Sequence, residues 1–453
     1  MHSSSLSRNP HLALGLGVAG MLAAEAGYRA RISVAWLLLE GAVGLAALLL
    51  AWRVRERLRL VPLLALALAF QAGLVAVHLW LGADADVDTS IVYRLRGEAL
   101  LDGEYPRSEY PTGAVLLFAL EALTGDTRVA NAFGMIPFQL ATVAAVWALR
   151  TRWSAWLAAL VALWPANAYY WEFKYDLVPA ALLAVGLVLA LRGRWTWAGV
   201  ALGLGTAMKW TPALAFLALA VWLVASGRRG AARAHALAFA VALALVHLPF
   251  LIWSPHEVAA AYTQQGDRPI TAESVWYLLL RPFGLAELHR HLSEGAGAPG
   301  WANVAATSIQ AALVLAVLVA AWRVRGNPRA AVALAAMAPT VFLLSNRIFS
   351  PQFLVPILAA WAVAAALVVQ SPREQLAVGL AAMAATGANA FVYPFALPFY
   401  DVTWPIASAT LFAVGFGLTG WLAVKAAAEH DRSREREDHE GVEVVEDHRQ
   451  VEE

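Results

Sequence analysis

Residues 60–81 read LVPLLALALAFQAGLVAVHLWL, an apolar run without a charged side chain that follows four arginines between positions 53 and 59. About 20 apolar residues are what an α-helix needs to cross the hydrocarbon core of a bilayer. Hydrocarbon offers no partner for an unpaired backbone N–H or C=O group, so a spanning segment of this kind must be helical. The run therefore predicts a transmembrane helix that is entered from a basic loop.

The same apolar character extends over most of the chain. Of its 453 residues, 60% are hydrophobic and 14% are charged, and the mean hydropathy is +0.60. These values lie outside the range of soluble domains. The chain has no cysteine, so neither a disulfide framework nor a thiolate metal site is available. We expect one membrane domain over residues 1–428 and a charged cytoplasmic tail over 429–453 that is mostly disordered.

Successive apolar segments indicate a polytopic membrane protein. They occupy residues 12–26, 33–51, 60–81, 127–149, 154–170, 176–191, 196–208, 211–225, 234–253, 302–322, 330–345, 350–369, 376–393 and 402–425. None shows the alternation of apolar and polar residues that is typical of a membrane β-barrel. The sequence therefore predicts an all-α fold, a transmembrane helical bundle of about 12–14 spans.

Arginine clusters predict the orientation of this bundle. Under the segment order above, the basic loops all fall on one side, and they contain residues 53–59, 150–152, 192–194, 228–233, 323–329 and 373. Cytoplasmic loops carry an excess of Lys and Arg, so we expect these loops and both termini to be cytoplasmic in a multi-pass plasma-membrane protein. The long connections 82–126 and 254–301 then lie outside.

Three aspartates open the first external loop. Asp84, Asp86 and Asp88 alternate with apolar residues directly after the predicted helix 60–81, and Tyr93 follows them. A carboxylate beside an apolar wall is suited to act as a general base. The competing interpretation, which spacing alone favours, is that the acids only mark a solvated loop.

Two further polar patches interrupt apolar segments. Glu172, Lys174 and Asp176 stand between two predicted spans with no room for a long loop, where they could bind substrate or pair with one another. Lys209 and Trp210 divide the stretch 196–225 into two short segments that meet at the external side. Lysine at membrane depth lines a watery cavity, pairs with an anion or snorkels to the surface.

Arginines suited to phosphate occur in the remaining external segments. Arg268 and Arg347 each present the planar fork of donors that matches a phosphate, although each could instead anchor a helix at the interface. The histidines do not have zinc-site spacing, and the chain contains no glycine-rich phosphate loop, nucleophile elbow or nucleic-acid module. We therefore expect no metal, no cofactor and no nucleic-acid partner.

The order of these motifs resembles the GT-C superfamily of membrane glycosyltransferases, and most closely glycosyltransferase family 87, a mannosyltransferase-like group. Three stretches support the resemblance: the aspartate loop leading to Tyr93, Gly103-Glu104-Tyr105-Pro106 and Glu109-Tyr110-Pro111; Asp176 followed by Met208-Lys209-Trp210-Thr211-Pro212; and Glu273-Ser274-Val275-Trp276 with Ser350-Pro351-Gln352. The sequence departs from the family pattern at Thr112, where a second proline is common, and in offering several aspartates where one acts.

The resemblance implies a transfer of a hexose from a polyprenyl-phosphate sugar to a lipid-linked or cell-envelope glycan acceptor on the external face, with inversion. Asp88 would be the base, with Asp86 as the alternative. Lys209, Arg268 and Arg347 would hold the donor phosphate. Substrate contacts would come from Tyr93, Glu172, Lys174, Asp176, Trp210 and Gln352, and Trp171, Tyr175 or Trp210 could stack on the sugar.

Two other classes of membrane protein compete with this interpretation. A transporter or flippase of a lipid-linked or anionic substrate would also have midplane charges and broken helices, but it predicts inverted repeats, and no convincing pair of interrupted segments is present. A scaffold without catalysis would leave the aspartates exposed and unpaired. The gathering of the polar patches on one face favours the enzyme.

Overall fold

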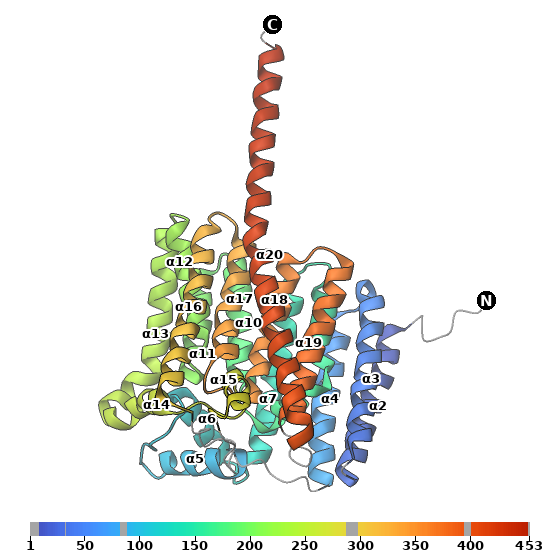
Figure 1. The fold of residues 1–453 in the computed structure, drawn as a ribbon, viewed down its shortest axis with the longest axis vertical. Coiled ribbons are helices and arrows are strands. Elements are labelled where there is room, and N and C mark those ends of the chain that lie inside the picture. Colours follow the sequence, from blue (N-terminus) through green and yellow to red (C-terminus); the bar gives the residue numbers. More distant parts are fainter. Residues whose placement is uncertain (1–8, 32, 82–87, 287–297, 394–399, 452–453) are drawn as a thin grey trace, which may run out of the picture.

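The computed structural model describes residues 9–31, 33–81, 88–286, 298–393 and 400–451. Within these ranges the chain is helical and contains no strand, which confirms the predicted all-α fold (Figure 1). The first helices are α2 (Pro10–Ala30), α3 (Val34–Arg53), η1 (Arg55–Arg57), α4 (Leu60–Trp80), the π-helical turn η2 (Asp88–Tyr93), α5 (Arg94–Leu101), α6 (Thr112–Ala122), α7 (Thr127–Trp147), α8 (Ser154–Leu163), η3 (Pro165–Asn167) and α9 (Ala168–Phe173).

The second part of the chain continues the bundle. Its helices are α10 (Leu177–Leu191), α11 (Trp195–Met208), α12 (Pro212–Ala225), α13 (Arg229–Trp253), α14 (Pro255–Asp267), α15 (Val275–Leu280), η4 (Arg281–Phe283), α16 (Gly300–Arg323), α17 (Pro328–Ser345), η5 (Pro351–Phe353), α18 (Leu354–Val368), α19 (Pro372–Val392) and α20 (Tyr400–Val451). Helices α17 and α18 are buried along almost their whole length and form the centre of the bundle.

Every apolar segment predicted from the sequence lies on one or more of these helices. In the described part of the chain, nine helices are long and apolar enough to cross a membrane, and α9 with α10 adds a tenth candidate that is bent by 111°. Helices α8, α11 and α12 are apolar but shorter, with 10, 14 and 14 residues. Helix length therefore supports a multi-pass membrane protein, while the predicted count of 12–14 spans is not reached by length alone.

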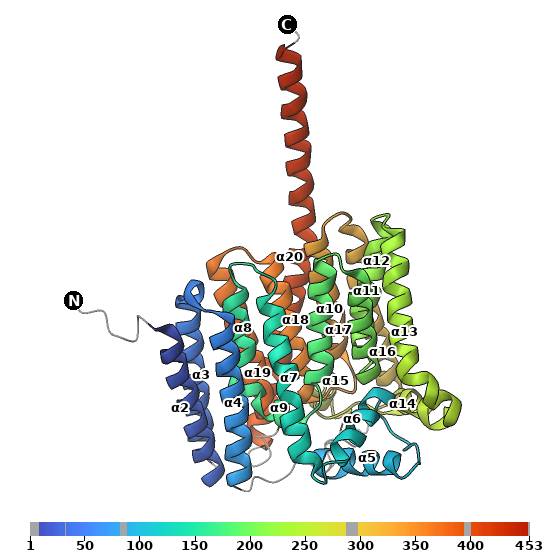
Figure 2. The same ribbon diagram turned by 180° about the vertical axis from the view of Figure 1, so that it is seen from behind.

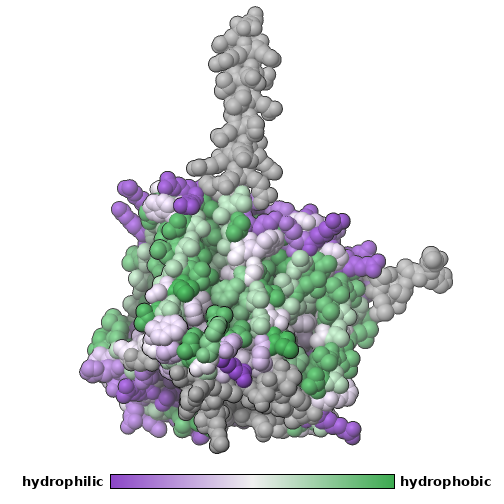
Figure 3. Space-filling view, in the orientation of Figure 1, coloured by the Kyte–Doolittle hydropathy of each residue, from purple (hydrophilic) through white to green (hydrophobic). Residues whose placement is uncertain are grey.

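The two ends of the bundle differ in character. Basic connections meet at one end, where Arg192 Nη2 donates to the Ala148 carbonyl at 2.9 Å and Arg152 donates to the Gln370 carbonyl. Helices α5, α6, α14 and α15 lie at the opposite end (Figures 1 and 2). Apolar side chains cover the helices between these ends, and hydrophilic side chains gather at both (Figure 3). The arginine loops thus share one end, as the sequence predicted, while their cytoplasmic location stays a prediction.

The last helix extends beyond the rest of the bundle. Helix α20 continues as one helix to Val451 and projects from the bundle (Figure 1). Glu and Arg are good helix formers, and the apolar part of α20 already supplies the helical nucleus on which they extend. The division into a membrane domain and a charged tail stays a prediction.

Candidate active site

A polar cavity of about 390 Å³ is lined by residues of η2, α14 and the segments beside α6 and α15. Helices α6, α14 and α15 lie at the end of the bundle away from the basic loops (Figure 1). The wall of the cavity comes from η2, the segment before α6, and the breaks between α9 and α10 and between α11 and α12. The end of α14, the segment between α14 and α15, the end of α17, the segment between α17 and η5, and η5 itself complete the wall. The lining residues are Asp88, Val92, Glu109, Tyr110, Pro111, Tyr175, Lys209, Trp210, Thr211, Gln265, Arg268, Thr271, Glu273, Phe342, Leu343, Asn346, Ile348, Phe349, Ser350, Gln352 and Phe353.

Helix breaks bring the charged side chains to this cavity. Helix α11 ends at Lys209, whose backbone is extended, and Pro212 begins α12 because proline fits the first turn of a helix. The predicted pair of short segments is therefore confirmed. Gly113 allows α6 to pack against the end of α11, since a Cβ there would lie 2.6 Å from the Ala207 carbonyl oxygen. Tyr110 and Pro111, which precede α6, line the same cavity as Lys209.

The first charged pair joins the aspartate loop to the break after α9. Lys174 Nζ lies 2.5 Å from Asp88 Oδ2, with 5% of the lysine side chain and 27% of the aspartate side chain exposed. Asp88 therefore faces the cavity while the buried Lys174 ammonium contacts it. Lys174 itself supports the wall and does not line it.

The second pair lies deeper. Lys209 Nζ donates to Asp176 Oδ1, and the Asp176 side chain is wholly buried, with no partner on Oδ2 among the described residues. The ammonium also lies 4.5 Å from the centre of the Phe353 ring and 5.4 Å from that of Tyr175, distances at which the ring faces attract a cation. Lys209 lines the cavity, so it offers a paired positive charge to an incoming anion.

Glu172 takes a different direction from its neighbours Lys174 and Asp176. It is buried and hydrogen-bonds to Nδ1 of His78 on α4. Trp171 likewise packs against Phe70, with ring centres 5.8 Å apart, and is not part of the cavity. The second polar patch of the sequence is thus divided between the cavity and a separate buried network.

Of the two arginines predicted to bind the donor phosphate, one lines the cavity and the other does not. Arg268 lines the cavity, with Nη1 at 3.5 Å from Gln265 Oε1. Arg347 is outside the lining and donates to the carbonyls of Gln265 and Gly266, so it fixes the segment that carries Arg268. Arg347 therefore supports the backbone near Arg268 and is not itself at the cavity, although its residue type is suited to phosphate.

The other predicted site residues also differ in whether they line the cavity. Trp210 and Gln352 line the cavity; the Trp210 ring packs 4.4 Å from that of Phe342, and Ser350 Oγ donates to Gln352 Oε1 at 2.6 Å. Tyr93 is fully buried and stacks on Phe118, with ring centres 4.0 Å apart, so it supports the wall from behind. Asp86 lies outside the described residues.

Two acids at the cavity were not proposed as site residues from the sequence. Glu273 lies between α14 and α15, and burial raises its pKa to about 7, against the lowering effect of Arg268 and a hydrogen bond with Thr271. Glu109 also lines the cavity, 3.9 Å from Arg96. The sequence could have indicated both as site residues, because Glu109 belongs to the motif Glu109-Tyr110-Pro111 and Glu273 to the motif Glu273-Ser274-Val275-Trp276. Among the described residues, no group of three His, Asp or Glu side chains could hold a metal ion.

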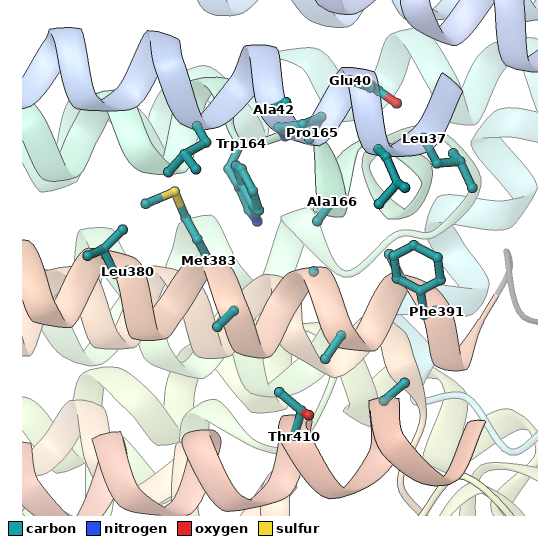
Figure 4. A pocket seen from close by; sticks show the side chains of 18 of the residues that line it. Leu37, Glu40, Ala42, Trp164, Pro165, Ala166, Leu380, Met383, Phe391 and Thr410 are labelled. Atoms are coloured by element: carbon teal, nitrogen blue, oxygen red, sulfur yellow. The ribbon is translucent and has the colours of Figure 1, made fainter. Parts of the chain in front are cut away.

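A second cavity of about 740 Å³ lies between α3, η3, α19 and α20. Its lining is almost entirely apolar, with Leu37, Trp164, Met383 and Phe391 prominent, and Glu40 is the only charged residue in that lining (Figure 4). Such a surface suits hydrocarbon and lacks the paired charges that group transfer needs. The polar cavity is therefore the candidate active site.

Comparison with known families gives the class of this site. The chain matches the model of glycosyltransferase family 87 over residues 109–351. That range covers more than half of the chain, so the protein belongs to glycosyltransferase family 87 and is a membrane glycosyltransferase. Lys174, Asp176, Lys209 and Glu273 lie inside the matched range, and Asp88 lies before it. No curated protein matches the chain. Family membership sets aside the transporter, flippase and scaffold alternatives.

Proposed function

We propose that the protein transfers a hexose, mannose in the first instance, from a polyprenyl-phosphate sugar to a lipid-linked or cell-envelope acceptor on the external face of the plasma membrane. The observation that supports this most directly is that a carboxylate, Asp88, and a lysine, Lys209, line one cavity at the end of the bundle away from the basic loops. Transfer from a sugar phosphate requires a base on one side of the sugar and a cation at the phosphate.

Asp88 acts as the base in the proposed reaction. The acceptor oxygen attacks the anomeric carbon as Asp88 takes the hydroxyl proton, and the bond from that carbon to the phosphate oxygen breaks. The electron pair leaves with the polyprenyl phosphate, so the anomeric configuration inverts. Lys174, whose Nζ lies 2.5 Å from Asp88 Oδ2, holds the base in its position at the cavity.

Lys209 and Arg268 hold the leaving phosphate. Both line the cavity, and charge-assisted hydrogen bonds to phosphate are among the stronger hydrogen bonds in proteins. Trp210 offers an aromatic surface to the sugar, and Gln352 offers an amide for its hydroxyls.

The apolar cavity accommodates the hydrocarbon chain of the lipid-linked acceptor. Asn389 stands between the two cavities, because its Nδ2 donates to the Pro351 carbonyl at 2.8 Å and to Tyr170 Oη at 3.3 Å, while its neighbours Ala388 and Ala390 line the apolar cavity. Pro351 in turn lies between Ser350 and Gln352 of the polar cavity. An acceptor chain in the apolar cavity would place its head group beside that wall.

The test is transfer by purified protein in detergent or nanodiscs. A panel of polyprenyl-phosphate hexoses and the corresponding nucleotide sugars is offered with a membrane-lipid extract as acceptor, and the stereochemistry of the product is determined. Transfer from a polyprenyl-phosphate sugar with inversion is expected. Transfer only from a nucleotide sugar, or with retention, would overturn the proposal.

A further inference from the structure

We propose that His78 is a positioning residue for the base: the buried triad Glu25–His78–Glu172 holds the chain so that Lys174 stays on Asp88. This inference builds on the proposed function, in which Asp88 is the base. It concerns a cluster on α2, α4 and α9 that is not part of either cavity lining.

The triad is buried and closely spaced. His78 is 1% exposed, its Nε2 lies 2.7 Å from Glu25 Oε1, and its Nδ1 hydrogen-bonds to Glu172 Oε2. Glu25 also accepts from Arg29 Nε at 2.6 Å. Each ring nitrogen thus faces one carboxyl group, and the arrangement joins three helices at a single side chain.

This geometry selects the doubly protonated imidazole. Neutral histidine has one N–H donor and one acceptor nitrogen, so a neutral His78 would turn a lone pair toward one of two carboxylates. With both nitrogens protonated, each donates to one carboxylate, and the buried charges compensate one another. His78 can therefore hold Glu25 and Glu172 together only while it carries its second proton or while a carboxyl group supplies one.

Other charged groups lie near the triad on the neighbouring helices α2, α3 and α7. Helix α2 contributes Arg29, and α3 contributes Glu40, whose carboxyl group faces Glu25. Helix α7 contributes Arg128, whose guanidinium lies 5.4 Å from the centre of the Phe173 ring. The region thus contains one histidine and two arginines together with three acids, Glu25, Glu40 and Glu172. A protonated His78 therefore leaves no excess of buried negative charge there.

Glu172 connects the triad to the base. The Glu172 carbonyl accepts from Asn131 Nδ2 at 2.5 Å, and the ring of the next residue, Phe173, stacks on His78 with centres 5.6 Å apart. Lys174 follows in extended conformation, at φ −136° and ψ 148°, and reaches Asp88. His78 therefore fixes Glu172 and Phe173, the two residues that precede Lys174. Loss of the His78 contacts would leave Lys174 free to move away from Asp88.

The experiment is a double-mutant cycle read as kcat and KM separately. Lys174→Met removes the ammonium that contacts Asp88 and should lower kcat by about 10- to 100-fold, because a misplaced catalytic group loses rate. His78→Gln offers one donor and one acceptor, cannot donate to both carboxylates, and should lower kcat by a smaller factor with little change in KM for the donor. The double variant should lose no more than Lys174→Met alone, because His78 acts through Lys174.

A matched control separates positioning from general stability. His235 on α13 is equally buried and hydrogen-bonds to the Trp195 carbonyl at 3.0 Å, so His235→Gln should leave kcat unchanged. An unchanged kcat in His78→Gln, or losses that multiply in the double variant, would overturn the inference.

A structural readout keeps the inference independent of the transfer reaction. A cryo-EM structure of His78→Gln in nanodiscs should show Lys174 Nζ withdrawn from Asp88. Retention of that pair would refute the positioning role even with transfer fully demonstrated. Conversely, a wild-type protein without transfer would refute the proposed function, while this structural comparison would still decide the role of His78.

Discussion

The two cavities of this protein lie close together but have opposite chemistry. The polar cavity is built at helix breaks, so its wall contains backbone turns and two lysine–aspartate pairs. The apolar cavity is built mostly on the continuous helices α3, α19 and α20, and it contains Glu40 as its only charged lining residue. In a membrane, charge is placed where helices are interrupted and water can enter, and hydrocarbon is placed along intact helices. The comparison predicts that damage to the polar cavity impairs chemistry and damage to the apolar cavity impairs lipid recognition.

The largest effect should come from Asp88→Asn. The substitution keeps size and much hydrogen bonding but removes the proton acceptor, and loss of a general base costs about 100- to 10,000-fold in rate. The measurement is kcat with a polyprenyl-phosphate sugar, with donor binding measured in parallel. Asp86→Asn is the control. Full activity in both variants would discard the aspartate base, whereas loss in Asp86→Asn alone would transfer the role to that residue.

Lys209→Met should weaken donor binding by about 10- to 100-fold, since a hydrogen bond to a charged group is worth about 1.5–3 kcal/mol. The single variant also leaves Asp176 buried without its cation, which is costly for folding. Lys209→Met with Asp176→Asn removes both charges and should regain melting temperature without regaining affinity. Unchanged binding in the double variant would reduce Lys209 to a structural partner of Asp176.

Glu273→Gln should change the pH dependence of donor binding. The pKa of Glu273 is raised to about 7 by burial, so the wild-type side chain is largely protonated below pH 7 and becomes anionic above it. An anion in the cavity repels a phosphate donor, and wild-type affinity should fall by several-fold as pH rises through about 7. The glutamine variant should lose this dependence. A parallel fall in both proteins would assign it to another group.

The smallest effect should come from filling the apolar cavity. Ala388→Trp places an indole among the residues that line it and should raise KM several-fold for a long-chain acceptor with little change in kcat. An acceptor with a truncated chain should be unaffected. Ala377→Trp, on an exposed face of the same helix, is the control. Equal loss with long and short chains would exclude lipid recognition by this cavity.

The sequence predicted the helices and their breaks because both depend on local patterns. The length of apolar runs indicated the spans, and charge parity placed Lys209 at a break rather than within one helix. The pairings could not be predicted this way. Asp88 and Lys174 are 86 residues apart, His78 and Glu172 are 94 apart, and Asp176 and Lys209 are 33 apart. Each depends on which helices pack together, which hydrophobicity does not specify.

Individual residues show the same limit. Glu172, Lys174 and Asp176 look alike as a polar patch, yet the chain direction at the α9–α10 bend brings Glu172 to His78 and brings Lys174 and Asp176 to the cavity-lining residues Asp88 and Lys209. Arg268 and Arg347 are equally suited to phosphate by type, and only the fold shows that Arg347 holds the backbone near Arg268. Residue type thus predicted the chemistry, and tertiary packing decided the roles.

The short helices at the polar cavity make bilayer thickness a variable of the reaction. Helices α11 and α12 have 14 residues each, about 21 Å at 1.5 Å per residue, against a hydrocarbon core of about 30 Å. Leu217 and Trp197 are exposed on these helices, so the surrounding lipids meet a short apolar surface there. A membrane adapts to such hydrophobic mismatch by thinning locally. Thin bilayers would therefore bring the aqueous phase down to Lys209, and thick ones would seal it beneath hydrocarbon.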